Sequence, residues 1–145
     1  MQGYSDPDNR RDMPWQIFNN LEPKEEYVLE KEAFTHLKKV IAIRNQTPAL
    51  HYASLLTLYA DYFVYVYLRE FQGENVIVAI NNGHQPMPLP LNINIKDNTN
   101  IPPRIKENLE EKTLFNQMDP NATPIQIEAG FLKIQLPGKT AIIYK

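Results

Sequence analysis

The charged residues best placed for chemistry lie close to the N-terminus. The aspartates Asp6, Asp8 and Asp12 alternate with the guanidinium groups of Arg10 and Arg11. Two carboxyl groups can act as acid and base when the environment of one raises its pKa. Neighbouring arginines do the opposite, because their positive charge lowers the pKa of a carboxyl group. We therefore interpret this cluster as an ion-pairing or ligand-contacting loop and assign it no catalytic residue.

No metal ion or organic cofactor is expected. The alternating aspartates resemble part of a calcium-binding loop, but the glycine and the distant bidentate glutamate of such loops are missing. The three histidines, His36, His51 and His84, lack the spacing of metal ligands. The sequence contains no cysteine, which excludes disulfides, thiolate nucleophiles and zinc–thiolate centres.

Composition and charge exclude several classes of function. The 145-residue chain has 43% hydrophobic and 22% charged residues, close to the average of globular domains. Its net charge of -2 gives no basic field for nucleic acid and no attraction to a membrane surface. No apolar run approaches the roughly 20 residues that span a bilayer. The first residues lack the charged and apolar regions of a signal peptide, and the compartment stays open.

The first element that could position the charged loop is one amphipathic helix, predicted over residues 23–46. Pro23 suits a first helical turn, and Pro48 forbids continuation beyond the end. Apolar residues recur at helical spacings and form one face: Tyr27, Phe34, Leu37 and Ile41. We expect this face to be buried, against the rest of the fold or against a second copy of the chain.

From residue 47 onward the hydrophobic period is two, which is typical of strands. Turn residues separate eight candidate strands, at 55–59, 63–71, 75–81, 87–95, 113–116, 125–128, 131–136 and 140–144. We predict a mainly β fold, an antiparallel β-sandwich of about seven or eight strands preceded by one helix and an N-terminal loop. The expected divisions are a loop at 1–22, a helix at 23–46 and a sandwich domain at 47–145.

Two candidate strands have predictable positions in their sheets. Pro86, Pro88 and Pro90 alternate and would leave one side of their strand without N–H donors, which predicts an edge strand. The run 76–80 is apolar on both faces, which predicts a central strand. Residues 101–112 begin with two prolines and are expected to form a surface connection with one or two helical turns.

The N-terminal run resembles a known enzyme family. Residues 6–15, with the sequence DPDNRRDMPW, resemble the segment after the eighth barrel strand of α-amylase-family glycoside hydrolases. The similarity is greatest to neopullulanases, maltogenic amylases and cyclomaltodextrinases. Residues 34–50, which end in Thr-Pro-Ala-Leu, resemble the last barrel helix and its exit. The runs 64–70, 76–82 and 136–144 are similar to strands of the family's C-terminal sandwich, and the resemblance covers essentially the whole chain.

The resemblance implies a C-terminal part of an enzyme that acts on α-glucans such as starch or maltodextrin. The family's catalytic carboxylates lie on a barrel of roughly 200 residues or more, which does not fit in this chain. The implied partners are this barrel and, in the intact enzyme, an α-glucan oligosaccharide. Asp6 and Arg10 match residues that bind glucose hydroxyls, although an ion pair that braces the loop explains the same two residues. Trp15 is a candidate for stacking on a sugar ring.

One strand carries aromatic residues on a single face. One face carries Phe63, Tyr65 and Tyr67, and the other carries the aliphatic residues Val64, Val66 and Leu68. We expect the aliphatic face to fill the sandwich and the aromatic face to pack on the helix or the barrel. The alternative is a stand-alone carbohydrate-binding module in which Tyr65 and Tyr67 stack on sugar rings.

Overall fold

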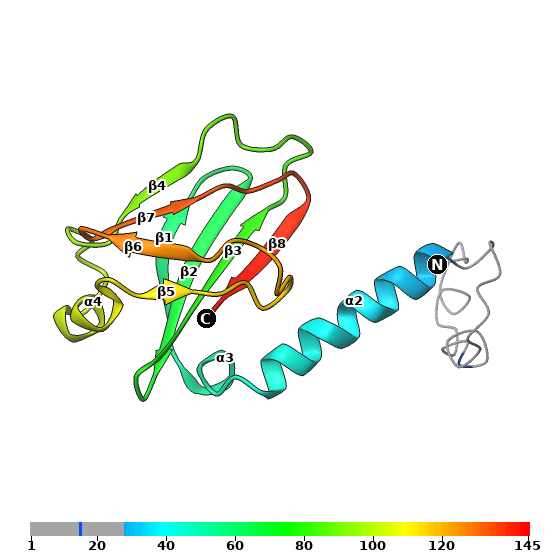
Figure 1. Ribbon diagram of the computed structural model, residues 1–145, viewed down its shortest axis with the longest axis horizontal. Coiled ribbons are helices and arrows are strands. Elements are labelled where there is room, and N and C mark those ends of the chain that lie inside the picture. Colours follow the sequence, from blue (N-terminus) through cyan, green and yellow to red (C-terminus); the bar gives the residue numbers. More distant parts are fainter. Residues whose placement is uncertain (1–14, 16–27) are drawn as a thin grey trace. The chain divides into compact units, whose positions relative to one another are not determined.

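The computed structural model describes residue 15 and residues 28–145 of the chain (Figure 1). The chain divides into two compact units, Met1–Lys39 and Val40–Lys145, and each is described by itself. Of the described residues, the second unit contains the whole β-sandwich.

Helix α2 (Val28–Asn45) confirms the predicted amphipathic helix over its described length. Glu30 lies in the first turn and Arg44 in the last, as the helix dipole favours. No residue of α2 is buried, and Leu37 and Ile41 of the predicted apolar face are exposed. Tyr27, the first member of that face, lies outside the described residues.

A second, short helix follows that the period-two pattern from residue 47 misses. Helix α3 (Ala49–Tyr52) begins after Pro48, whose φ of -52° and ψ of -37° are already helical. Ala49 and Leu50 are buried. Four residues are too few to show a helical period, so periodicity does not predict this element.

The sandwich consists of two four-stranded sheets in which all neighbouring strands are antiparallel, as predicted (Figure 1). The first sheet has the order β1-β2-β3-β8, with β1 (Leu55–Ala60), β2 (Val64–Phe71), β3 (Glu74–Asn81) and β8 (Thr140–Tyr144). The second has the order β4-β7-β6-β5, with β4 (Leu91–Asn94), β7 (Phe131–Ile134), β6 (Ile125–Glu128) and β5 (Thr113–Leu114).

The inner faces of the two sheets form the main hydrophobic core. In β2 the aliphatic residues are buried and the tyrosines are half-buried, which confirms the predicted division of its faces. In β7 the alternation is equally clear, since Leu132 and Ile134 are buried while Phe131 and Lys133 are exposed. The fully buried side chains of this core include Val66, Leu68, Ile77, Ile127, Leu132 and Ile134.

The predicted sheet positions hold, but the proline strand is shorter than expected. β3 lies between β2 and β8 and is buried on both faces, as predicted. β4 is an edge strand, but it begins only at Leu91, so Pro86, Pro88 and Pro90 precede it. Proline lacks an N–H for ladder pairing, so the prolines end the strand as well as mark its sheet edge.

The connection at 101–112 contains helix α4 (Pro103–Leu109). One side of it is not at the surface, because Ile101, Ile105 and Leu109 are buried in the main core. The expected one or two helical turns are therefore present, but the connection is not confined to the surface. The spacing of these three isoleucine and leucine residues by four is that of a helix face.

Candidate functional site

The structure describes one of the three predicted sugar-contacting residues. Trp15 is 55% exposed, and its ring packs edge-to-face against Phe34, with ring centroids 6.3 Å apart and an interplanar angle of 82°. An aromatic pair of this geometry holds the indole while leaving much of its surface open. Asp6 and Arg10 lie outside the described residues, so their sugar-binding role stays a prediction.

The aromatic face of β2 is occupied by packing and hydrogen bonding. The rings of Tyr65 and Tyr67 lie with their centroids 5.5 Å apart. The hydroxyl of Tyr65 is 3.0 Å from the hydroxyl of Thr57 on β1, and the two share a hydrogen bond. Tyr67 packs against a second hydrophobic cluster, and burial raises the pKa of its phenol. These contacts agree with a packing face and leave little of the two rings for a sugar.

The second hydrophobic cluster covers part of the outer face of the first sheet. Helix α3 supplies Ala49 and Leu50, and Ile43 from the last turns of α2 packs against the same cluster. The sheet contributes the buried residues Val76, Val78 and Ile143. This cluster, on the side of the sheet away from the main core, therefore holds the end of α2 and helix α3 against the sandwich.

Helix α3 is held at both ends by charged side chains. At its start, Glu74 Oε2 accepts a hydrogen bond of 2.8 Å from the amide of Ala49. Glu74 also pairs with Lys145. Burial alone would raise the pKa of Glu74, but the hydrogen bonds from Lys145 and Ala49 outweigh it and hold the pKa below its ordinary value.

At the other end of α3, two arginines donate to backbone carbonyls, and we name this pair the arginine clamp (Arg44 and Arg69). Arg69 Nη1 donates to Leu50 O at 3.0 Å, and Arg44 Nη1 donates to the same oxygen at 2.7 Å. Arg69 also donates to Ala53 O through Nε, at 3.1 Å, and through Nη2. Positive charge at a helix C-terminus is favourable, so the clamp fixes the turn from α2 into the sandwich.

An exposed aromatic pair lies at the turn between β1 and β2. Tyr62 is 92% exposed, and its ring contacts that of Phe63 edge-to-face at 4.9 Å. Asp61 Oδ1 accepts hydrogen bonds from the amides of Phe63, at 2.8 Å, and Val64, at 2.6 Å. These backbone hydrogen bonds lower the pKa of Asp61 and hold the turn in one conformation.

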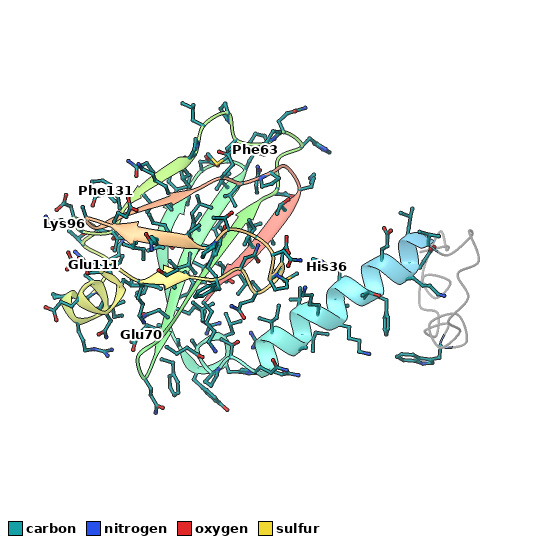
Figure 2. All side chains as sticks on the ribbon, viewed as in Figure 1. His36, Phe63, Glu70, Lys96, Glu111 and Phe131 are labelled. Carbon is teal, nitrogen blue, oxygen red and sulfur yellow. The ribbon has the colours of Figure 1, made fainter. Side chains whose placement is uncertain are left out.

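The outer face of the second sheet contains a depression of about 500 Å³. Its lining is partly polar, with Asn92, Gln126, Glu128 and Lys133, and partly apolar, with the ring of Phe131. Figure 2 shows Phe131 and Lys96 at the same end of the sandwich. The sequence analysis named none of these residues as functional.

The described residues lack two other kinds of site. Within residue 15 and residues 28–145, no group of three or more histidine, aspartate or glutamate side chains could hold a metal ion. In the same part of the chain, no helix has the length and apolar character needed to cross a membrane.

Comparison with known proteins gives a consistent result, although no family model matches the chain. Over 82 residues, 57% of the chain, it is 40% identical to a cyclomaltodextrinase from Thermoanaerobacter pseudethanolicus. Its fold matches an α-amylase from Anoxybacillus with a TM-score of 0.70 and 22% identity over 99% of the chain. An α-amylase from Geobacillus thermoleovorans, solved with acarbose, matches with a TM-score of 0.68 and 24% identity over the same share.

The chain matches the C-terminal region of α-amylase-family glycoside hydrolases. The predicted resemblance is thereby confirmed, as is the predicted sandwich fold. The match covers only 13% of the cyclomaltodextrinase and 26% of each of the two α-amylase structures.

Two features of the chain were not found from the sequence. The arginine clamp depends on Arg69 reaching Ala53 and Leu50 across the fold, and a short helix leaves no periodic signal. The depression depends on which strands are neighbours, because Asn92 lies far in sequence from Lys133 but is its partner in the ladder. The local signal for its outward side chains was the alternation of residue types in 125–128 and 131–134, which matches their alternation of exposed and buried positions.

Proposed function

We propose that this chain is the C-terminal part of an α-glucan-hydrolysing enzyme, in which the sandwich stabilises a catalytic barrel and supplies no catalytic group. The observation that carries the proposal is the combined match, by sequence to a cyclomaltodextrinase and by fold to α-amylases, over 13% to 26% of their length. The proposed division is a barrel loop at 1–22, the last barrel helix at 23–46 and the sandwich at 47–145.

The proposed role of the sandwich is supported by its second hydrophobic cluster. Val76, Val78 and Ile143 are buried on the outer side of the first sheet, where α3 and Ile43 cover them. Burying these apolar residues together fixes the end of α2 to the sandwich. In the proposed division α2 is the last barrel helix, so this cluster would join the barrel to the sandwich.

The barrel loop would also bring substrate contacts. The carboxylate of Asp6 would accept hydrogen bonds from neighbouring glucose hydroxyls, and the planar guanidinium of Arg10 would donate in a fork. Trp15, more than half exposed, would offer a ring face to the glucan. These roles require the barrel.

The isolated chain would also expose a surface that the barrel covers in the proposed enzyme. Leu37 and Ile41 are exposed on α2, and in the absence of a barrel this face would pair with a second copy. Light scattering of the 145-residue chain tests this part. A strict monomer at all concentrations would contradict it.

The main test compares the isolated chain with the longer protein encoded by the same gene. The isolated chain should release no reducing sugar from maltodextrin, cyclodextrin or pullulan, because the proposal gives it no catalytic carboxylate. The longer protein should hydrolyse at least one of them. Turnover by the isolated chain above a buffer control, or a gene that encodes no barrel upstream, would contradict the proposal.

Variants of the longer protein test the substrate contacts. Asp6→Ala and Arg10→Ala should each lower kcat/KM by roughly 10- to 100-fold, the loss expected for one charge-assisted hydrogen bond. Asp8→Ala is the matched control, since Asp8 lies in the same loop with the same charge but matches no sugar-contacting position. If the pair only braces the loop, double replacement by Asn and Gln would lower the melting temperature and leave KM unchanged.

A further inference from the structure

The depression on the outer face of the second sheet is built by strand register. Asn92 on β4 is the ladder partner of Lys133 on β7. Phe131 on β7 is the partner of Glu128 on β6, and Gln126 of β6 lines the same depression as Lys133. Neighbouring strands lie about 4.8 Å apart. The outward side chains therefore form rows that run across the strands, and neighbours within a row are separated by about that distance.

The floor of the depression rests on the packed core. Behind the outward residues, Ile93, Ile127 and Leu132 point into the main core and are buried. Gln126 is fixed by a hydrogen bond of 3.1 Å from its Nε2 to Thr113 Oγ1 on β5. Because Nε2 is the donor in this bond, the amide oxygen of Gln126 is left as an acceptor.

The remaining polar groups are available to a ligand. In the described part of the chain, Asn92, Glu128 and Lys133 form no side-chain hydrogen bond or ion pair with the protein. Lys133 and Glu128 carry opposite charges, so the lining has no net charge. This arrangement favours a neutral ligand with many hydroxyl groups over a phosphate or a polyanion.

Phe131 adds the apolar part of the site. Its side chain is 37% exposed beside the polar rows, on a strand whose other apolar residues face the core. A pyranose ring has an apolar face of C–H groups and an edge of hydroxyls. An exposed aromatic ring flanked by amide, carboxylate and ammonium groups complements both.

We propose that this depression binds a neutral α-linked glucan chain, with Phe131 packing on one sugar ring and Asn92, Gln126, Glu128 and Lys133 binding its hydroxyls. The sugar class follows from the lining, and the α-linkage rests on the proposed function. The volume of about 500 Å³ falls in the range of small-ligand sites, roughly 300–1,000 Å³. The outer sheet face thus becomes a sugar-binding surface besides the Asp6 and Arg10 pair.

The test is a titration of the isotope-labelled 145-residue chain with maltohexaose, followed by NMR. Saturable shifts are expected at the side-chain amides of Asn92 and Gln126 and at the backbone amide of Phe131, with a Kd on the order of 1 mM, as suits a shallow site. Phe131→Ala should weaken binding at least about tenfold, the effect of one lost ring contact of about 1.4 kcal/mol. Phe131→Tyr should retain it, because the ring remains.

Two controls distinguish specific binding at this site from nonspecific binding of sugars to exposed rings. Phe63→Ala removes another exposed ring, labelled in Figure 2, that does not line the depression, and it should leave the affinity unchanged. Cellohexaose, with β-linkages, and an oligogalacturonate, with negative charge, should each bind more weakly than maltohexaose.

Three results would overturn the proposal. The first is the absence of a saturable chemical shift change at about 10 mM maltohexaose, ten times the expected Kd. The second is an unchanged affinity for maltohexaose in Phe131→Ala. The third is an affinity for cellohexaose equal to that for maltohexaose. Each leaves the proposed function intact, because hydrolysis by the longer protein is measured separately. Failure of the proposed function would instead appear as absent hydrolysis, whatever the isolated chain binds.

Discussion

Replacing Arg69 by methionine should destabilise the sandwich by about 2–3 kcal/mol. Arg69 donates to two backbone carbonyls, Ala53 O and Leu50 O, at the end of α3. Methionine keeps most of the apolar stem, so lost packing contributes little. The main cost is therefore the loss of charge-assisted hydrogen bonds.

The size of the effect follows from what each carbonyl retains. Leu50 O keeps the hydrogen bond of 2.7 Å from Arg44, so it stays satisfied. Ala53 is buried and both side-chain donors to its carbonyl come from Arg69. A hydrogen bond to a charged group is worth about 1.5–3 kcal/mol, and a buried acceptor left without a donor costs about 1–3 kcal/mol, the two being views of the same loss.

The assay is urea unfolding followed by far-UV circular dichroism, which reports on the strands. Arg69→Lys keeps the charge but reaches one carbonyl at most, so it should cost about 1 kcal/mol. Arg44→Met should cost less than about 1 kcal/mol, because Arg69 still serves Leu50 O. For a unit of this size, the loss in Arg69→Met corresponds to a fall in melting temperature of roughly 10–20 °C.

The losses of unfolding free energy in the single and double variants show which carbonyl depends on which arginine. Equal losses in Arg44→Met and Arg69→Met would refute the assignment of Ala53 O as the decisive acceptor. A wild-type stability in Arg69→Met would refute the role of the arginine clamp altogether. A double variant that costs more than the sum of the two single variants is expected, because Leu50 O then loses both donors.

Two further predictions concern the core and the first turn of the sandwich. Leu132→Ala, at a fully buried position between the sheets, should cost about 2–5 kcal/mol of unfolding free energy in urea, whereas exposed Leu89→Ala should change it by less than about 0.5 kcal/mol. Because the folded pKa of Asp61 lies below its ordinary value near 3.9, its stabilising contribution is complete above that pH and is lost as the pH falls through the folded pKa. Asp61→Asn should therefore flatten the acid limb of stability below about pH 4, and an unchanged slope in urea midpoints would exclude this role.

The strands were predictable because their signals are local. The bounds of β6 and β8 agree with the sequence alternation residue for residue. Turns were also marked, since Gly73 and Gly130 adopt φ values of +88° and +81°, which glycine adopts without strain. Where a pattern depends on neighbours two residues apart, the sequence determines the element.

The parts that the sequence did not predict depend on contacts between distant residues. Helix α3 is four residues long and is held by Glu74 and the arginine clamp from elsewhere in the fold. The depression exists only once Asn92 is paired with Lys133. The sugar-contacting roles of Asp6 and Arg10 came from family resemblance and remain predictions, and Trp15 is placed but its ligand role is untested.

The single tryptophan gives this chain a built-in optical label. Trp15 belongs to the unit Met1–Lys39, whereas the β-sandwich belongs to Val40–Lys145 and contains none. Excitation at the red edge of the indole band therefore reads the N-terminal segment alone, while strand dichroism reads the sandwich. Quenching or a shift in Trp15 emission on addition of a soluble partner would report engagement of that segment without any introduced dye.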